Sequence, residues 1–151
     1  MKTCASCEQA KALTNFSGDP RGVSGVHAYC RDCQKIYAKK YRASPKGRVP
    51  GLLHDAARRR PVSITREWLL ERLERGVCEA TGLPFSFAPM EDGRHQNPFA
   101  PSLDRCDPKG DYTPGNTRLV IFAYNTAKGQ MQASQAFEVI TAMARGMCGH
   151  A

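Results

Sequence analysis

The sequence lacks any apolar run near the length of about 20 residues that a membrane-spanning helix requires. The residues from Met1 to Lys11 also lack the basic-then-apolar order of a secretory signal peptide. Internal repeats and low-complexity tracts are missing as well. We therefore expect a cytoplasmic protein without a membrane span, built from units that differ from one another.

Acidic side chains are in deficit. The 151 residues include 22 Lys and Arg but only 14 Asp and Glu, which gives a formal net charge of +8. Such an excess attracts polyanions through long-range electrostatics and through the release of condensed counterions. The composition favours a nucleic acid as the partner, without indicating which one.

Seven cysteines are an awkward number for a disulfide scaffold. Four of them form two C-x-x-C pairs, Cys4 with Cys7 and Cys30 with Cys33, and together they can complete the closed Cys₄ shell of a structural zinc. A redox C-x-x-C is the alternative, but it normally stands alone within a βαβ pattern. His27 is close enough in sequence to replace one ligand. Because four thiolates suffice, we expect it at the surface.

A segment rich in helix breakers, residues 44–50, predicts a linker between a zinc-binding unit (1–43) and a second domain (51–151). In the second domain we expect two helices, an irregular stretch, a two-stranded hairpin and a final helix. Thr65 is a suitable N-cap for the second helix, and Ser134 for the last. The whole is an α+β fold. The expected helices span 52–60, 65–76 and 134 onwards, the irregular stretch spans 76–100, and the strands of the hairpin span 102–105 and 117–123.

Basic residues gather in two places, on a predicted helix after Cys33 and at the end of the 52–60 helix. These clusters neutralise phosphates and position a protein on a duplex. For any single lysine, a solvated helix face is an equally good explanation. The clusters consist of Lys35, Lys39, Lys40 and Arg42, and of Arg58, Arg59 and Arg60.

The segment 101–128 carries the chemistry. A strand ends at Asp104, a loop rich in Gly and Pro follows, and a second strand runs to Phe122 before Asn125 opens a helix. The Asp104 carboxylate and the Asn125 amide oxygen can converge on one hard cation, which prefers oxygen ligands. A single Mg²⁺ or Mn²⁺ would suit this ββα arrangement.

This segment reads Ser102-Leu-Asp-Arg105, then Tyr112, Asn116 and Asn125-Thr-Ala-Lys128. It resembles the HNH, or His-Me finger, endonucleases, most closely the variants of phage-type enzymes and PacI-type restriction endonucleases. The resemblance implies a Mg²⁺-dependent nuclease that cuts double-stranded DNA in a bacterial or phage-infected cell. It also implies roles for single residues. Asp104 and Asn125 would hold the metal, Asn116 would brace the loop, Lys128 would touch a phosphate, and Arg105 and Tyr112 would be the catalytic pair.

The sequence departs from this family at two points. No histidine occupies the position of the usual general base, so Tyr112 would activate or orient the water, and Arg105 would lower the tyrosine pKa or stabilise the transition state. Many relatives also have a second cysteine zinc site around the hairpin. We expect none here, because the remaining cysteines are isolated. The histidines are His27, His54, His95 and His150, and the isolated cysteines are Cys78, Cys106 and Cys148.

Each site residue also has a structural alternative. Asp104 can pair with Arg105 or Arg118, Tyr112 can pack on the hairpin, and Asn125 can cap a helix. The competing function is a non-catalytic zinc-containing DNA-binding module, and an RNA-binding or ribosomal role is the third. Cleavage of both strands would need a homodimer, sequential nicking or reorientation of one monomer.

Overall fold

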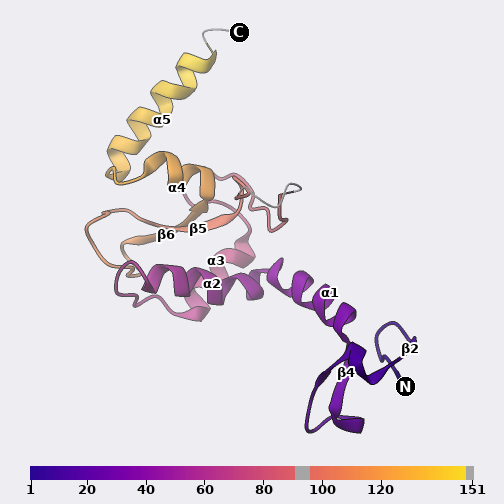
Figure 1. Ribbon diagram of the computed structural model, residues 1–151. Helices are drawn as coiled ribbons and strands as arrows, with labels where there is room; N and C mark the ends of the chain where they lie inside the picture. The colour runs from indigo at the N-terminus through magenta and orange to yellow at the C-terminus, as the bar shows by residue number, and fades with distance from the viewer. Residues whose placement is uncertain (91–95, 149–151) are drawn as a thin grey trace. The chain divides into compact units, whose positions relative to one another are not determined.

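The computed structural model describes residues 1–90 and 96–148, so His95 and His150 lie outside the described residues, as does the side chain of Cys148. The chain mixes helices with short strands and divides into two compact units, Met1–Arg42 and Ala43–Ala151 (Figure 1). No helix among the described residues is long and apolar enough to cross a membrane.

The first unit is built from two short antiparallel hairpins and one helix. β1 pairs with β2, and β3 pairs with β4, which leads directly into α1. Its buried cluster consists of Phe16 and three cysteines, with few other apolar side chains around them. So small a core depends on a cross-link or a metal for stability. The elements are β1 (Lys2–Thr3), β2 (Ala10–Lys11), β3 (Phe16–Gly18), β4 (Val26–Cys30) and α1 (Arg31–Arg42), with 3₁₀ turns at Leu13–Asn15 and Val23–Gly25.

The second unit places a β-hairpin between helices. α2 and α3 lie on one side of the strands β5 and β6, and α4 lies on the other (Figure 1). Successive strand residues point to opposite faces. Leu103 therefore joins the core beneath the hairpin, while Ser102 and Asp104 point towards α4. The elements are α2 (Pro45–Ala57), α3 (Arg66–Arg75), β5 (Pro101–Arg105), β6 (Thr117–Ile121), α4 (Phe122–Lys128) and α5 (Ala133–Cys148).

The hairpin and α3 confirm the sequence expectations. Strand β5 pairs antiparallel with β6, with Leu103 opposite Leu119. The Thr65 hydroxyl accepts a hydrogen bond from the Trp68 N–H at 3.1 Å, and α3 is followed by its C-cap Gly76, whose φ of 75° is the left-handed conformation typical of a glycine C-cap. These terminal signals are local, so the helix bounds could be predicted from the sequence.

The expected linker over 44–50 is wrong, because these residues begin α2. Ser44 is the N-cap and its hydroxyl accepts from the Gly47 N–H at 3.2 Å, while Pro45 occupies the first turn, where a proline loses no hydrogen bond. Pro50 is accommodated inside the helix, and Val49 beside it is buried. Because α2 ends at Ala57, the three arginines 58–60 follow the helix instead of lying on it.

Two other helix starts differ from expectation. Strand β6 ends at Ile121 and α4 begins at Phe122, so Asn125 lies inside the helix and does not open it. Helix α5 begins at Ala133, one residue before the expected cap Ser134. The irregular character expected for 76–100 is seen in its described part, which contains turns and one isolated bridge between Val77 and Pro84.

Candidate functional site

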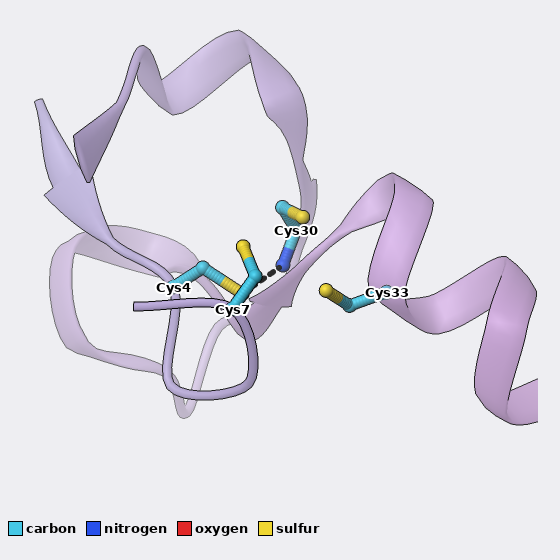
Figure 2. Close-up of side chains that lie close together, drawn as sticks. All are labelled: Cys4, Cys7, Cys30 and Cys33. Atoms are coloured by element: carbon cyan, nitrogen blue, oxygen red, sulfur yellow. Dashed lines mark hydrogen bonds between the residues drawn. The ribbon is translucent and has the colours of Figure 1, made fainter. Parts of the chain in front are cut away.

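The four N-terminal cysteines form one cluster. Their sulfur atoms all lie within 4.8 Å of one another, and Figure 2 shows the side chains directed towards a common centre. Cys4 and Cys7 come from the turn after β1, Cys30 ends β4, and Cys33 lies in the first turn of α1. A tetrahedral zinc with Zn–S bonds of about 2.3 Å needs sulfurs about 3.8 Å apart, so this group can hold such an ion.

The backbone around the cluster favours thiolates. Burial opposes ionisation of Cys4, but hydrogen bonds from the N–H groups of Cys30, Cys7 and Ser6 outweigh it and lower its pKa to about 6. The Cys30 N–H donates to the Cys4 sulfur at 3.2 Å (Figure 2). At Cys33 the Ser6 side chain favours the thiolate, yet burial and the neighbouring thiols together raise the pKa to about 11. Zinc binding would therefore release protons from part of the cluster.

Lys11 is a member of this site that the sequence did not reveal. Its ammonium lies 3.5 Å from the Cys30 sulfur and 3.3 Å from the Asp32 carboxylate. Four thiolates around one Zn²⁺ carry a net charge of −2, which a neighbouring cation offsets. His27 is not part of the cluster: its Nδ1 accepts from the Tyr29 N–H at 3.0 Å, and it is half-buried.

The candidate catalytic carboxylate, Asp104, is buried and held by two cations. Its side chain is 3% exposed, Oδ2 lies 3.0 Å from the Arg118 guanidinium, and Oδ1 lies 3.0 Å from the Lys128 ammonium. The pairing with Arg118 is one of the structural alternatives that the sequence offered. Lys128, 1% exposed, also donates to the Arg105 carbonyl at 2.9 Å. In this arrangement the Lys128 ammonium bonds to Asp104 and to the Arg105 carbonyl, and the phosphate contact expected for it stays a prediction.

Asn125 faces the same place from α4. Its Nδ2 donates to the Ser102 hydroxyl at 2.7 Å and to the Leu103 carbonyl at 3.1 Å. These two bonds fix the amide plane. Among the described residues, no group donates to its Oδ1, which leaves this oxygen available to a ligand.

These side chains surround one open pocket of about 190 Å³. The pocket brings together α4, the end of β5, the loop that follows β5 and the residues that follow α2. Arg118 is not part of its wall, so it holds Asp104 from behind. The wall includes Arg59, Asp104, Arg105, Tyr112, Asn125 and Lys128.

Arg105 and Tyr112 lie next to each other in this pocket. The guanidinium carbon of Arg105 lies 5.1 Å from the centre of the Tyr112 ring, and its Nη1 donates to the Gly110 carbonyl at 3.0 Å. Tyr112 is 2% exposed and belongs to the core cluster, so its ring packs against the hairpin as well as lining the pocket. Its backbone is fixed by the Pro61 carbonyl at 3.0 Å and the Ser63 N–H at 2.9 Å.

Asn116 ties the loop between the two strands together. Its Oδ1 accepts from the Asp107 N–H at 2.8 Å, and its Nδ2 donates to the carbonyls of Asp107 at 3.1 Å and Asp111 at 3.0 Å. A Cβ at Gly110 would come within 2.7 Å of that Nδ2, so only glycine leaves room for it. The loop is thereby held in one shape beside Arg105 and Tyr112.

The oxygen donors of this pocket suit Mg²⁺ or Mn²⁺. Asn125 offers an amide oxygen to which none of the described residues donates, and each Asp104 oxygen retains a second lone pair beyond its ion pair. Charge opposes the binding of a cation, because Asp104 together with Arg118 and Lys128 carries a net charge of +1. The residues fit the ion by donor type, and the neighbouring ammonium must be accommodated.

The two basic clusters are at the surface of their own units. On α1 the exposed side chains of Lys35, Lys39, Lys40 and Arg42 alternate with exposed Ile36, Tyr37 and Tyr41. Tyr37 stacks on Tyr29 with ring centres 5.3 Å apart. Arg58, Arg59 and Arg60 are exposed after α2, and among them only Arg59 lines the pocket.

The remaining described cysteines are not clustered. Cys78 is buried against Val120 and Ile121, and Cys106 is half-buried. In the part of the chain that the structure describes, the N-terminal cysteines are the one group of His, Cys, Asp and Glu side chains able to hold a metal by their spacing.

No protein-family model matches the chain, and no curated protein matches it. A solved structure that is similar to it is described as "An extraordinary mechanism of DNA perturbation exhibited by the rare-cutting HNH restriction endonuclease PacI". The sequences are 21% identical, the match covers 99% of this chain and 98% of that chain, and the TM-score is 0.46.

Proposed function

We propose that this protein is a metal-dependent DNA endonuclease of the ββα-metal, HNH-like class, with an N-terminal unit stabilised by zinc. One observation carries the proposal: Asp104, Arg105, Tyr112 and Asn125, from the strand, the loop and the helix, converge on a single open pocket. A structural role explains each residue alone, but it does not explain why their polar groups share one cavity with an exposed arginine, Arg59.

Asp104 and Asn125 would hold the Mg²⁺ or Mn²⁺ ion, which supplies a Lewis acid for the phosphate and lowers the pKa of water. Arg105 faces the ring of Tyr112 and would place positive charge beside the scissile phosphate. The Tyr112 hydroxyl would orient the attacking water and hold a proton there. Arg59, which also lines the pocket, would bind a phosphate oxygen.

Double-stranded DNA is the proposed substrate because the basic residues are dispersed in the way that backbone contacts require. The exposed cationic residues of α1 and the arginines after α2 would neutralise phosphates without reading sequence. Lys128 would take no part in this contact in the arrangement seen, since it is buried against Asp104.

The alternative function, a zinc-containing DNA-binding module without catalysis, is favoured by one specific observation. Both oxygens of Asp104 are already paired with cations, as in a purely structural carboxylate. Plasmid incubated with the protein and Mg²⁺, Mn²⁺ or EDTA distinguishes the two. The nuclease produces nicked or linear DNA with the metals and none with EDTA, whereas the binding module shifts the plasmid without cutting it.

Asn125→Ala gives the sharpest variant, and Asn97→Ala is its matched control. In both asparagines Nδ2 donates to one serine hydroxyl and one carbonyl, but Asn97 bonds to Ser86 and Ala88, outside the pocket. We expect Asn125→Ala to lose cleavage and to retain DNA binding, while Asn97→Ala retains both. Equal cleavage by the two variants would reject the proposed site.

A further inference from the structure

The Asp104 carboxylate is paired with two cations, and only one of these cations lines the pocket. Arg118 and Lys128 each approach one of its oxygens to 3.0 Å. Lys128 lines the pocket together with Asn125, whereas Arg118 is outside the pocket wall and is held from behind by the Tyr124 hydroxyl at 3.2 Å. The ammonium of Lys128 thus stands on the side from which a metal ion would approach.

A buried carboxylate requires a counter-charge at all times. Asp104 is 3% exposed. Without a metal, the ammonium of Lys128 is therefore the cation that neutralises its Oδ1, the carboxylate oxygen on the side of the pocket. When a divalent ion binds the same oxygen, that ammonium becomes a like charge a few ångströms away, inside a poorly solvated site. Arg118 continues to hold the other oxygen in either state.

We propose that Lys128 is the resident cation of the Asp104–Asn125 site, and that a divalent metal binds by displacing its ammonium. Lys128 is then a positioning residue that keeps Asp104 in place without metal and sets the affinity for metal. The inference rests on the proposed function to the extent that Asp104 and Asn125 are the metal ligands. The flexible four-carbon stem of lysine permits such a movement, which the fixed fork of an arginine would resist.

The first test measures Mn²⁺ binding to the full chain, with its cysteine cluster loaded with zinc, by the loss of the free-ion signal in electron paramagnetic resonance. Lys128→Met removes the competing cation, so its affinity for Mn²⁺ should rise by on the order of tenfold or more. Arg118→Met is the matched control, because it removes an equal charge from the back of the same carboxylate. Its affinity should change much less.

Equal Mn²⁺ affinities for wild type and Lys128→Met would overturn the proposal, as would an equal gain in Arg118→Met, which would indicate general charge neutralisation. Asn125→Ala should lose the site in either background. If Mn²⁺ binds to neither wild type nor Lys128→Met, the metal site itself is wrong, and the proposed function fails along with this inference.

A second measurement needs no substitution, and so does not depend on how well Lys128→Met folds. Acylation of the wild-type protein with an amine reagent, read by mass spectrometry, should leave Lys128 nearly unlabelled because it is 1% exposed. Saturating Mg²⁺ should increase its labelling several-fold, while the exposed Lys109 serves as an internal control. Unchanged labelling of Lys128 under conditions where Mn²⁺ is shown to bind would overturn the displacement.

Discussion

The pair formed by Asp104 and Lys128 should dominate the stability of the second unit. The two side chains are 3% and 1% exposed and lie 3.0 Å apart, so Asp104 is the carboxylate that neutralises Lys128, while Asp104 itself is also paired with Arg118. Asp104→Ala leaves the ammonium buried and unpaired, and breaking a buried pair in this way costs about 3–5 kcal/mol of the free energy of unfolding. The variant should therefore be close to unfolding in a domain of ordinary stability.

Lys128→Met should be less damaging than Asp104→Ala. The carboxylate keeps the guanidinium of Arg118 at 3.0 Å, so the loss is nearer that of one charge-assisted hydrogen bond, about 1.5–3 kcal/mol. In the double variant no buried charge remains from the pair, and the two losses should not add. We expect a coupling energy on the order of 2 kcal/mol.

Urea unfolding followed by tryptophan fluorescence measures these values selectively. The chain has one tryptophan, Trp68, and it lies in α3 of the second unit, so the signal reports that unit and not the cysteine-rich one. Single losses that add to within about 0.5 kcal/mol in the double variant would show that the two charges do not stabilise each other, and our account of the pair would be refuted.

Three further predictions concern zinc, the tyrosine and the arginines. Purified protein should contain close to one zinc per chain by elemental analysis, and Cys4→Ser or Cys30→Ser should lose it; zinc-free wild type would contradict the cluster's role. Tyr112→Phe should lower the cleavage rate by about 10²–10⁴ with DNA affinity unchanged, and a near wild-type rate would leave Tyr112 a packing residue. Arg59→Ala should lower the cleavage rate far more than Arg60→Ala, although both should weaken DNA binding to a similar extent. Equal rates would remove Arg59 from the pocket's chemistry.

The parts of this fold that follow from short-range signals could be predicted from the sequence. The spacing of the cysteines predicted a cluster because each C-x-x-C turn is local, and Thr65 and Gly76 marked the ends of α3 by their capping chemistry. The start of α2 could not be predicted from residue types alone. Pro45 and Pro50 indicate a linker by composition, but Ser44 caps the helix and places Pro45 where its missing N–H costs nothing.

The contacts between the residues of the candidate site were harder to predict than the residues themselves. The motif identified Asp104 and Lys128, 24 positions apart, but not that they bond to each other. That contact depends on how α4 packs on β5 and on which way a long side chain turns. Arg59 was placed in a general phosphate-binding cluster, because nothing in its neighbourhood distinguishes it from Arg58 or Arg60 until the helix end is positioned beside the loop.

The three hydrogen bonds of Asn116 have a consequence for how related chains can diverge. The Asn116 side chain has a fixed length and bonds both to the Asp107 backbone and to the Asp111 carbonyl, so it fixes the number of residues that the loop between them can contain. An exchange at an exposed position such as Lys109 alters none of these bonds. Inserting or deleting a single residue between 107 and 111 would move one carbonyl out of reach. Exposed positions of this loop such as Lys109 can therefore vary, whereas Gly110 and the length of the loop are fixed, and we expect related chains to show few insertions or deletions there.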